Sequence, residues 1–157
     1  MSDPPTPERF VADADVLAAD LLRGGAARDA LDLARCHSWV TLVATDPLLD
    51  DAEAVIGECA DPALAADWRE KIEALAETVD QSAGDHPGLA AAYHGAATQL
   101  LSYDETLRSA KTGATLRKYV AVSVRTPEAF VRLFDPDAMY EVAVGGEYPG
   151  PDRDPRA

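Results

Sequence analysis

Short β-rich runs alternate with longer helical patterns along this chain, and the alternation limits what it can fold into. Residues 9–13 (RFVAD) and 38–45 (SWVTLVAT) are apolar and rich in strand-forming residues, and each run precedes a segment with apolar residues at helical spacing. Strands that are joined through helices need crossover connections, which produce parallel pairing. The pattern therefore predicts an α/β protein with three layers: a mostly parallel central sheet and helices on both faces.

The same pattern predicts the order of elements. A proline directly after a capping residue marks helix starts at Pro62 and Pro127. We expect a flexible leader over residues 1–8, one domain over residues 9–135, and a partly disordered acidic Pro/Gly-rich tail over residues 136–157. The expected helices are 15–23, 26–36, 46–60, 61–81, 86–97 and 126–134, and the expected strands are 9–13, 38–45, 99–102 and 119–124, with an edge strand at 140–144.

The charge of the chain is strongly negative. It has 28 Asp and Glu residues against 14 Lys and Arg, a net charge of -14. Acid excess, scarce lysine and abundant alanine resemble the composition of proteins from salt-loving archaea. A carboxylate-rich surface stays hydrated and self-repelling when the Debye length shrinks to about 3 Å at 1 M salt. In ordinary salt this charge argues against binding nucleic acid, but in molar salt that argument largely lapses.

The charge also predicts that stability depends on salt. We expect the thermal unfolding midpoint to fall as KCl is lowered from molar concentration to about 0.1 M, because carboxylates repel one another over a Debye length of about 10 Å there. Thermal unfolding across a KCl series measures this. A midpoint that stays flat or rises as salt is removed would contradict it.

The sequence contains no sign of a membrane segment or of secretion. No apolar run is long enough to span a membrane, and the opening MSDPPTPE is acidic and Pro-rich, unlike a signal peptide. The two cysteines, Cys36 and Cys59, form no CxxC pattern, so neither a disulfide framework nor a zinc site is indicated. We therefore expect a cytoplasmic protein with no membrane partner.

Acidic residues stand at the carboxyl ends of two of the predicted strands. Asp13 is the last residue of the run at 9–13, and Asp104 comes two residues after the strand at 99–102. Parallel strands end at the same edge of a sheet, where α/β proteins bind ligands. Carboxylate oxygens suit Mg²⁺ or Mn²⁺, which keep several waters for a phosphate substrate. Further candidates for the same rim are Asp51, in the helix after the second strand, and Asp85 and His86, at the start of the helix that precedes the strand at 99–102.

Two other interpretations stay open at this point. In the first, Asp13 only ends the strand and Asp15 only caps the next helix, a role that aspartate fills well. In the second, the chain is a flavodoxin-like or Rossmann-like binder of small molecules. The absence of a Gly-rich phosphate loop after the first strand counts against the second.

Four blocks of the sequence, in order, resemble the PIN domain family of metal-dependent ribonucleases, which includes the VapC-like toxins of toxin–antitoxin pairs. The family's opening Asp-Thr-Asn motif corresponds to DADVL at 13–17. Its second block corresponds to TDPLLDDAEAVI at 45–56, and its third to DHPGLAAAYHGAATQLLSYDETL at 85–107. Its closing strand and helix correspond to VAVSVRTPEAFVRLF at 120–134.

The resemblance implies a metal-dependent endoribonuclease of the PIN type that acts as the toxin of a toxin–antitoxin pair. It implies RNA as substrate, an antitoxin protein as partner, and a two-fold homodimer whose apolar face would include Leu17, Leu21 and Leu22. An alternative is a catalytically weakened PIN-like domain that acts as a binding or regulatory module. The implied catalytic and Mg²⁺- or Mn²⁺-binding residues are Asp13, Asp51, Asp85 and Asp104, with Asp15, Glu53, His86 and Ser102 as auxiliary candidates.

The chain departs from the family pattern at two of the acidic positions. Asp51 stands where the family has Glu, and Glu53 is an alternative for that position. At the third position, counting back from Asp104 arrives at His86, while Asp85 is one residue away. A histidine there would weaken a site for a hard cation. Ser102 replaces the usual Thr and keeps its hydroxyl.

Overall fold

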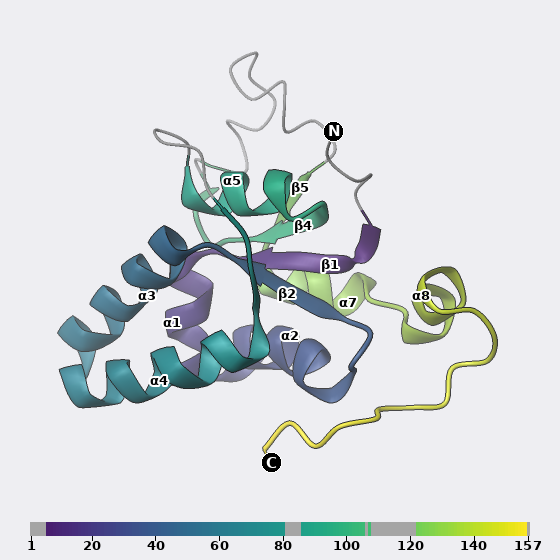
Figure 1. The fold of residues 1–157 in the computed structure, drawn as a ribbon, viewed down its shortest axis with the longest axis horizontal. Coiled ribbons are helices and arrows are strands. Elements are labelled where there is room, and N and C mark those ends of the chain that lie inside the picture. Colours follow the sequence, from purple (N-terminus) through teal and green to yellow (C-terminus); the bar gives the residue numbers. More distant parts are fainter. Residues whose placement is uncertain (1–5, 81–85, 106, 108–121, 157) are drawn as a thin grey trace.

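A computed structural model describes residues 6–80, 86–105, 107 and 122–156, and in it five parallel strands form one sheet in the order β3-β2-β1-β4-β5 (Figure 1). Phe10 of the central strand pairs with Leu42 of β2 on one side and with Gln99 of β4 on the other. The expected parallel sheet is confirmed, with the strands before Asp13 and Asp104 as direct neighbours. The strands are β1 (Thr6–Ala12), β2 (Thr41–Ala44), β3 (Glu77–Thr78), β4 (Ala97–Leu101) and β5 (Ser123–Arg125).

Helices cover both faces of this sheet. Figure 1 shows α5 on one side of the central strands and α2 and α7 on the other. Thr45, Asp61 and Thr126 each accept a hydrogen bond from a backbone N–H of the helix they precede, with a proline in its first turn. The helices are α1 (Ala14–Leu22), α2 (Gly25–Cys36), α3 (Asp46–Cys59), α4 (Pro62–Leu75), α5 (Pro87–His94), α7 (Pro127–Leu133) and α8 (Pro136–Ala143).

The core lies between the sheet and its helices. Phe10 and Val11 of β1 and Leu100 and Leu101 of β4 are almost completely buried. The helices contribute many alanines, among them Ala27, Ala30 and Ala34 of α2, so they approach closely. No helix among the described residues has the length and apolar character needed to cross a bilayer.

Several expected boundaries are wrong. The first strand begins at Thr6, so the last residues of the expected leader belong to the sheet. The expected helix 61–81 ends at Leu75, and Glu77–Thr78 form the edge strand β3 against β2. Both β3 residues are exposed, so they carry no apolar alternation that would indicate a strand.

The expected edge strand at 140–144 is also wrong, because residues 140–143 form the last turn of α8 (Pro136–Ala143) and Val144 is its C-cap. Asp135 caps this helix by accepting a hydrogen bond from the Ala138 N–H, and Pro136 follows it. Tyr140 then packs edge-on against Trp39, with ring centroids 5.4 Å apart. The local capping signal thus outweighs the strand propensity of Tyr and Val.

The tail beyond α8 crosses back to α2 and makes specific contacts there. The backbone N–H groups of Asp152 and Arg153 donate to the Cys36 carbonyl at 2.9 and 3.0 Å. The Asp152 carboxylate accepts from the Ser38 N–H, and the Arg156 guanidinium forms two hydrogen bonds of 2.9 Å to the Asp32 carboxylate. Backbone hydrogen bonds, the Ser38–Asp152 hydrogen bond and the Arg156–Asp32 ion pair therefore hold the tail against α2 as far as Arg156, although the sequence predicts disorder there.

Acid is expected to release this tail. Hydrogen bonds from Ser38 hold the pKa of Asp152 below its ordinary 3.8, so protonation favours the undocked state. The stabilisation is complete above about pH 5 and is lost as the pH falls through the lowered native pKa. NMR signals of the Asp152 and Arg153 amides, followed from pH 7 to about pH 2, well below the unfolded pKa, measure this. Signals that stay at their docked positions at the acid end would contradict it.

Candidate functional site

The carboxyl ends of β1 and β4 meet at one edge of the sheet and bring the first acidic residues there. Ala12 is in register with Leu101, and the Asp13 N–H donates to the Leu101 carbonyl at 2.8 Å. Ser102 follows Leu101 directly, and Asp104 comes two residues later. The predicted convergence of the two strand ends is thus present in the fold.

Ser102 links the residues that follow the two strands. It is fully buried, and its Oγ–H donates to Asp13 Oδ2 at 3.1 Å. The same oxygen accepts a hydrogen bond from the Asp104 N–H at 3.0 Å. The other carboxylate oxygen of Asp13 accepts from the Ala14 N–H, and Asp13 is the residue that caps α1. The alternative interpretation in which Asp15 caps this helix is therefore wrong.

Asp15 lies in the first turn of α1, and its carboxylate is held on one side only. Oδ2 accepts a hydrogen bond from the Tyr103 N–H at 3.0 Å, whereas Oδ1 is buried with no hydrogen-bond partner among the described residues. Burial raises the pKa of Asp15 and the negative charge of Asp13 raises it further, hydrogen bonding to the Tyr103 and Val16 backbone lowers it in part, and Asp104 adds a smaller increase, so that the net shift is upward. Asp104 Oδ1 accepts a hydrogen bond from the Leu107 N–H at 3.2 Å. Three carboxylates thus share one region, and a cation there would offset their mutual repulsion and satisfy Asp15 Oδ1.

His86 faces the same region from the start of α5. Its Nδ1 accepts hydrogen bonds from the backbone N–H groups of Gly88 (3.1 Å) and Leu89 (3.4 Å). The neutral ring therefore carries its proton on Nε2, which lies 3.8 Å from Asp13 Oδ2. In this tautomer His86 presents a hydrogen-bond donor, and no lone pair for a metal. Asp85, the alternative at this position, lies outside the described residues.

The two candidates on α3 point in different directions. About 200° around the helix axis separates Asp51 from Glu53, since each residue turns the chain by about 100°. Glu53 accepts a hydrogen bond from Arg69 of α4 at 3.2 Å. Arg69 also contacts Asp46, Asp50 and Glu73, so Glu53 belongs to a charge cluster between α3 and α4. Asp51 is exposed on the other flank of the buried stripe of α3.

The structure therefore brings together Asp13, Asp15, His86, Ser102 and Asp104, and it directs Glu53 elsewhere. The set offers hard oxygen donors, and the partnerless Asp15 Oδ1 fits a hard cation. In the described ranges, however, no group of three or more His, Cys, Asp or Glu side chains is close enough to hold a metal ion.

Sequence reasoning missed Tyr103, whose backbone N–H orients Asp15 and whose hydroxyl donates to Glu128 at 3.4 Å. No sequence pattern indicates a backbone donor of this kind.

Comparison with known proteins gives a family but no activity. A family model described as "Family of unknown function (DUF7384)" matches residues 4–156. Neither the curated proteins nor the solved structures include a match to the chain.

Proposed function

We propose a function for this chain, which belongs to DUF7384, a family of unknown function: it is a divalent-metal-dependent endoribonuclease of the PIN type. The observation that carries the proposal is the partnerless buried oxygen of Asp15, whose carboxyl has a raised pKa beside Asp13 and Asp104. Such an oxygen is costly unless a cation or another donor satisfies it. RNA as the substrate rests on the resemblance of the four sequence blocks to the PIN family.

The residues at the sheet edge have distinct parts in this function. Asp13, Asp15 and Asp104 would hold Mg²⁺ or Mn²⁺, and Asp51 and Asp85 are the further candidates for completing the set. When bound, the ion would supply an acidified water and positive charge for the scissile phosphate. Ser102 positions Asp13 through their 3.1 Å hydrogen bond. The Nε2–H of His86, 3.8 Å from Asp13 Oδ2, would donate to a phosphate oxygen.

Partners follow from the same resemblance. An antitoxin protein would hold the nuclease inactive, and the protein would act in the cytoplasm. Leu17 cannot be part of the proposed dimer face, because it is 1% exposed and belongs to the core. Leu22 is 37% exposed and remains available for this face.

A second candidate function is that of a PIN-like binding or regulatory module without efficient catalysis. The specific observation in its favour is that the described residues lack an assembled group of three ligands, while the Nδ1 of His86 is occupied in capping α5. In this function the carboxylates would stabilise local structure through their hydrogen bonds to Ser102, to the Tyr103 backbone and to the backbone N–H groups of Ala14 and Leu107.

A cleavage assay distinguishes the two functions. We expect the purified protein to cut a 5′-labelled RNA in the presence of Mn²⁺ and to stop when EDTA is added. Asp13→Asn should lower the rate at least about 100-fold, because metal sites lose 10–100-fold even when an outer-shell partner is removed. Asp29→Asn, an exposed carboxylate of α2, is the matched control and should cleave like wild type. Equal rates in wild type and Asp13→Asn would contradict the nuclease proposal.

A further inference from the structure

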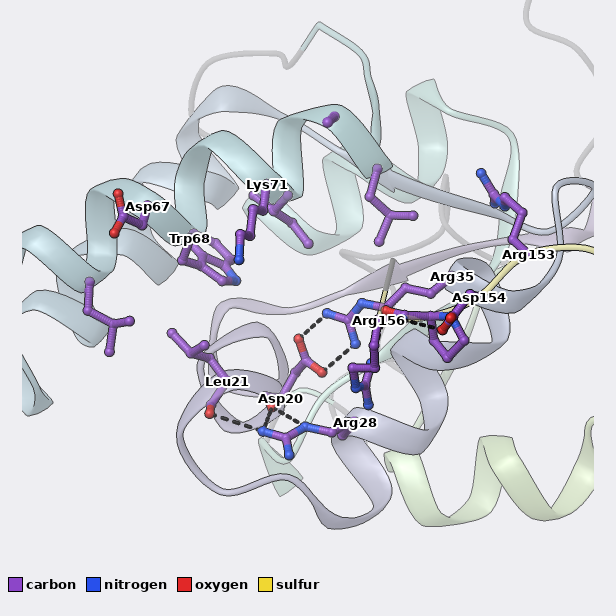
Figure 2. A pocket seen from close by; sticks show the side chains of 15 residues that line it. Asp20, Leu21, Arg28, Arg35, Asp67, Trp68, Lys71, Arg153, Asp154 and Arg156 are labelled. Atoms are coloured by element: carbon purple, nitrogen blue, oxygen red, sulfur yellow. Dashed lines mark hydrogen bonds and ion pairs between the residues drawn. The ribbon is translucent and has the colours of Figure 1, made fainter.

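A cavity of about 830 Å³ lies away from the sheet edge, between α1, α2, α4 and the C-terminal segment. Figure 2 shows Trp68 and Lys71 reaching from α4 toward Asp20 and Arg28 on the opposite wall. The volume is within the range of sites that bind small molecules, about 300–1,000 Å³. Its apolar lining comes from Leu21, Leu64, Ile72, Ala74 and Leu75.

The cavity gathers positive charge in a chain that is otherwise acidic. Five of the 14 basic residues line it, against three of the 28 acidic ones. If the charged residues of the lining had the composition of the whole chain, the acidic ones would outnumber the basic ones and the net charge of the lining would be negative. The basic residues are Arg28, Arg35, Lys71, Arg153 and Arg156, and the acidic residues are Asp20, Asp67 and Asp154.

Only part of this positive charge is neutralised within the protein. Arg35 pairs with the Asp20 carboxylate, and Arg156 pairs with Asp32. The guanidinium of Arg28 instead donates to the carbonyl oxygens of Asp20 and Leu21, at 2.9–3.2 Å, and those oxygens carry no formal charge.

Two further cations of the cavity likewise form no ion pair with a carboxylate of the described residues. Arg153 donates to the carbonyls of Ala34 and His37. Lys71 makes no hydrogen bond or ion pair within the part of the chain that the structure describes, and its ammonium is directed into the cavity (Figure 2). Arg28, Arg153 and Lys71 thus leave their positive charge available to an anion.

Trp68 adds an unused donor at the same place. Its side chain is only 5% exposed, and its indole N–H is buried with no hydrogen-bond partner among the described residues. Figure 2 shows this nitrogen on the cavity side, next to Lys71, which is three residues further along the same helix. A buried N–H without an acceptor is uncommon, and an acceptor atom of a ligand would satisfy it.

We propose that this cavity binds a small organic anion. A phosphate or carboxylate group would accept hydrogen bonds from the Trp68 indole N–H and the Lys71 ammonium, facing Arg28. An apolar part of the same molecule would pack against Leu21 and Leu64. The site shares no residue with the proposed metal site at the sheet edge. Anion binding in this cavity can therefore be tested independently of the proposed nuclease activity.

The Trp68 indole N–H provides a direct readout of binding. The chain has two tryptophans, so a ¹⁵N-correlated spectrum has two indole signals, and Trp68→Phe assigns them. Phenyl phosphate, benzoate and inorganic phosphate are titrated at constant KCl, with benzyl alcohol as the neutral control. We expect phenyl phosphate or benzoate, but not benzyl alcohol, to shift the Trp68 signal and leave the Trp39 signal in place. A response to only one of the two aryl anions would identify the acid group that the cavity accepts.

Variants test the assigned contacts. Lys71→Gln should weaken the apparent affinity about tenfold, the effect of losing one charge-assisted hydrogen bond. Arg132→Gln removes the same charge from the exposed face of α7 and should leave the affinity within about twofold, as expected for a distant surface charge. The proposal is overturned if no anion shifts the Trp68 signal, if benzyl alcohol shifts it equally, or if Arg132→Gln weakens binding as much as Lys71→Gln.

Discussion

Replacing Arg35 with methionine is expected to lower the free energy of unfolding by about 3 kcal/mol. Arg35 forms two parallel hydrogen bonds to the carboxylate of Asp20, at 2.8 and 2.5 Å, and Asp20 is only 2% exposed. Without the guanidinium, a buried carboxylate lacks its counter-charge. The value is at the lower end of the range for buried pairs because the side chain of Arg35 is 20% exposed and water reaches it.

A second substitution separates the lost pair from lost packing. Asp20→Asn in the Arg35→Met background removes the buried charge and should recover much of the loss, because the cost comes mainly from the unpaired carboxylate. Arg132→Gln, on an exposed face, should leave stability nearly unchanged. Urea unfolding of the four proteins measures these differences. A loss below about 1 kcal/mol for Arg35→Met, the value typical of exposed pairs, would contradict the assignment.

Replacing Asp15 with asparagine is expected to affect metal binding and apo stability in opposite directions. The asparagine side-chain oxygen can still accept from the Tyr103 N–H, but the buried negative charge is gone. Mn²⁺ should raise the thermal midpoint of wild type, because it binds only the folded state, and should leave that of Asp15→Asn nearly unchanged. Without metal the variant should be as stable as wild type or more stable at pH 7, since burial and Asp13 raise the pKa of Asp15.

The pH dependence of apo stability provides the internal check on Asp15. Its native pKa is above the unfolded value of 3.8, so the native state holds the proton more tightly. The stability of wild type should therefore decline relative to Asp15→Asn as the pH rises from 3.8 through the raised native pKa, and then level off. Thermal unfolding of both proteins with EDTA measures this. A relative stability that increases over that window would contradict the assignment.

The fold was largely predictable because its determinants are local. Apolar runs at 9–13 and 99–102 and the proline-marked helix starts specify the crossovers, and crossovers specify parallel strands. The element that sequence reasoning missed, β3, is two exposed residues held by pairing with Val43 and Ala44. A strand of that kind forms because it pairs with β2, and its two exposed residues show no alternation of apolar and polar side chains that would predict it. The α8 error has the opposite cause, because a local cap decided the structure over side-chain propensity.

The site was predictable only where topology alone places residues. Asp13 and Asp104 meet because two parallel strands end together. The direction of Glu53 depends on Arg69, 16 residues further along the chain, and the state of Asp15 depends on the Tyr103 backbone 88 residues away. The cavity of Trp68 and Lys71 likewise requires three helices and the tail to come together. Contacts of this range leave no periodicity in the sequence.

The measurement that tests the central claim most directly is the binding of Mn²⁺ at the sheet edge. Calorimetric titration in molar KCl would compare wild type with Asp13→Asn, Asp104→Asn and the exposed control Asp29→Asn. Binding to wild type and to Asp29→Asn with equal affinity is expected, with affinity reduced at least about 10-fold in the two strand-end variants. Equal affinity in all four proteins, or no heat of binding in wild type, would contradict a metal site and leave Asp13 as the residue that caps α1.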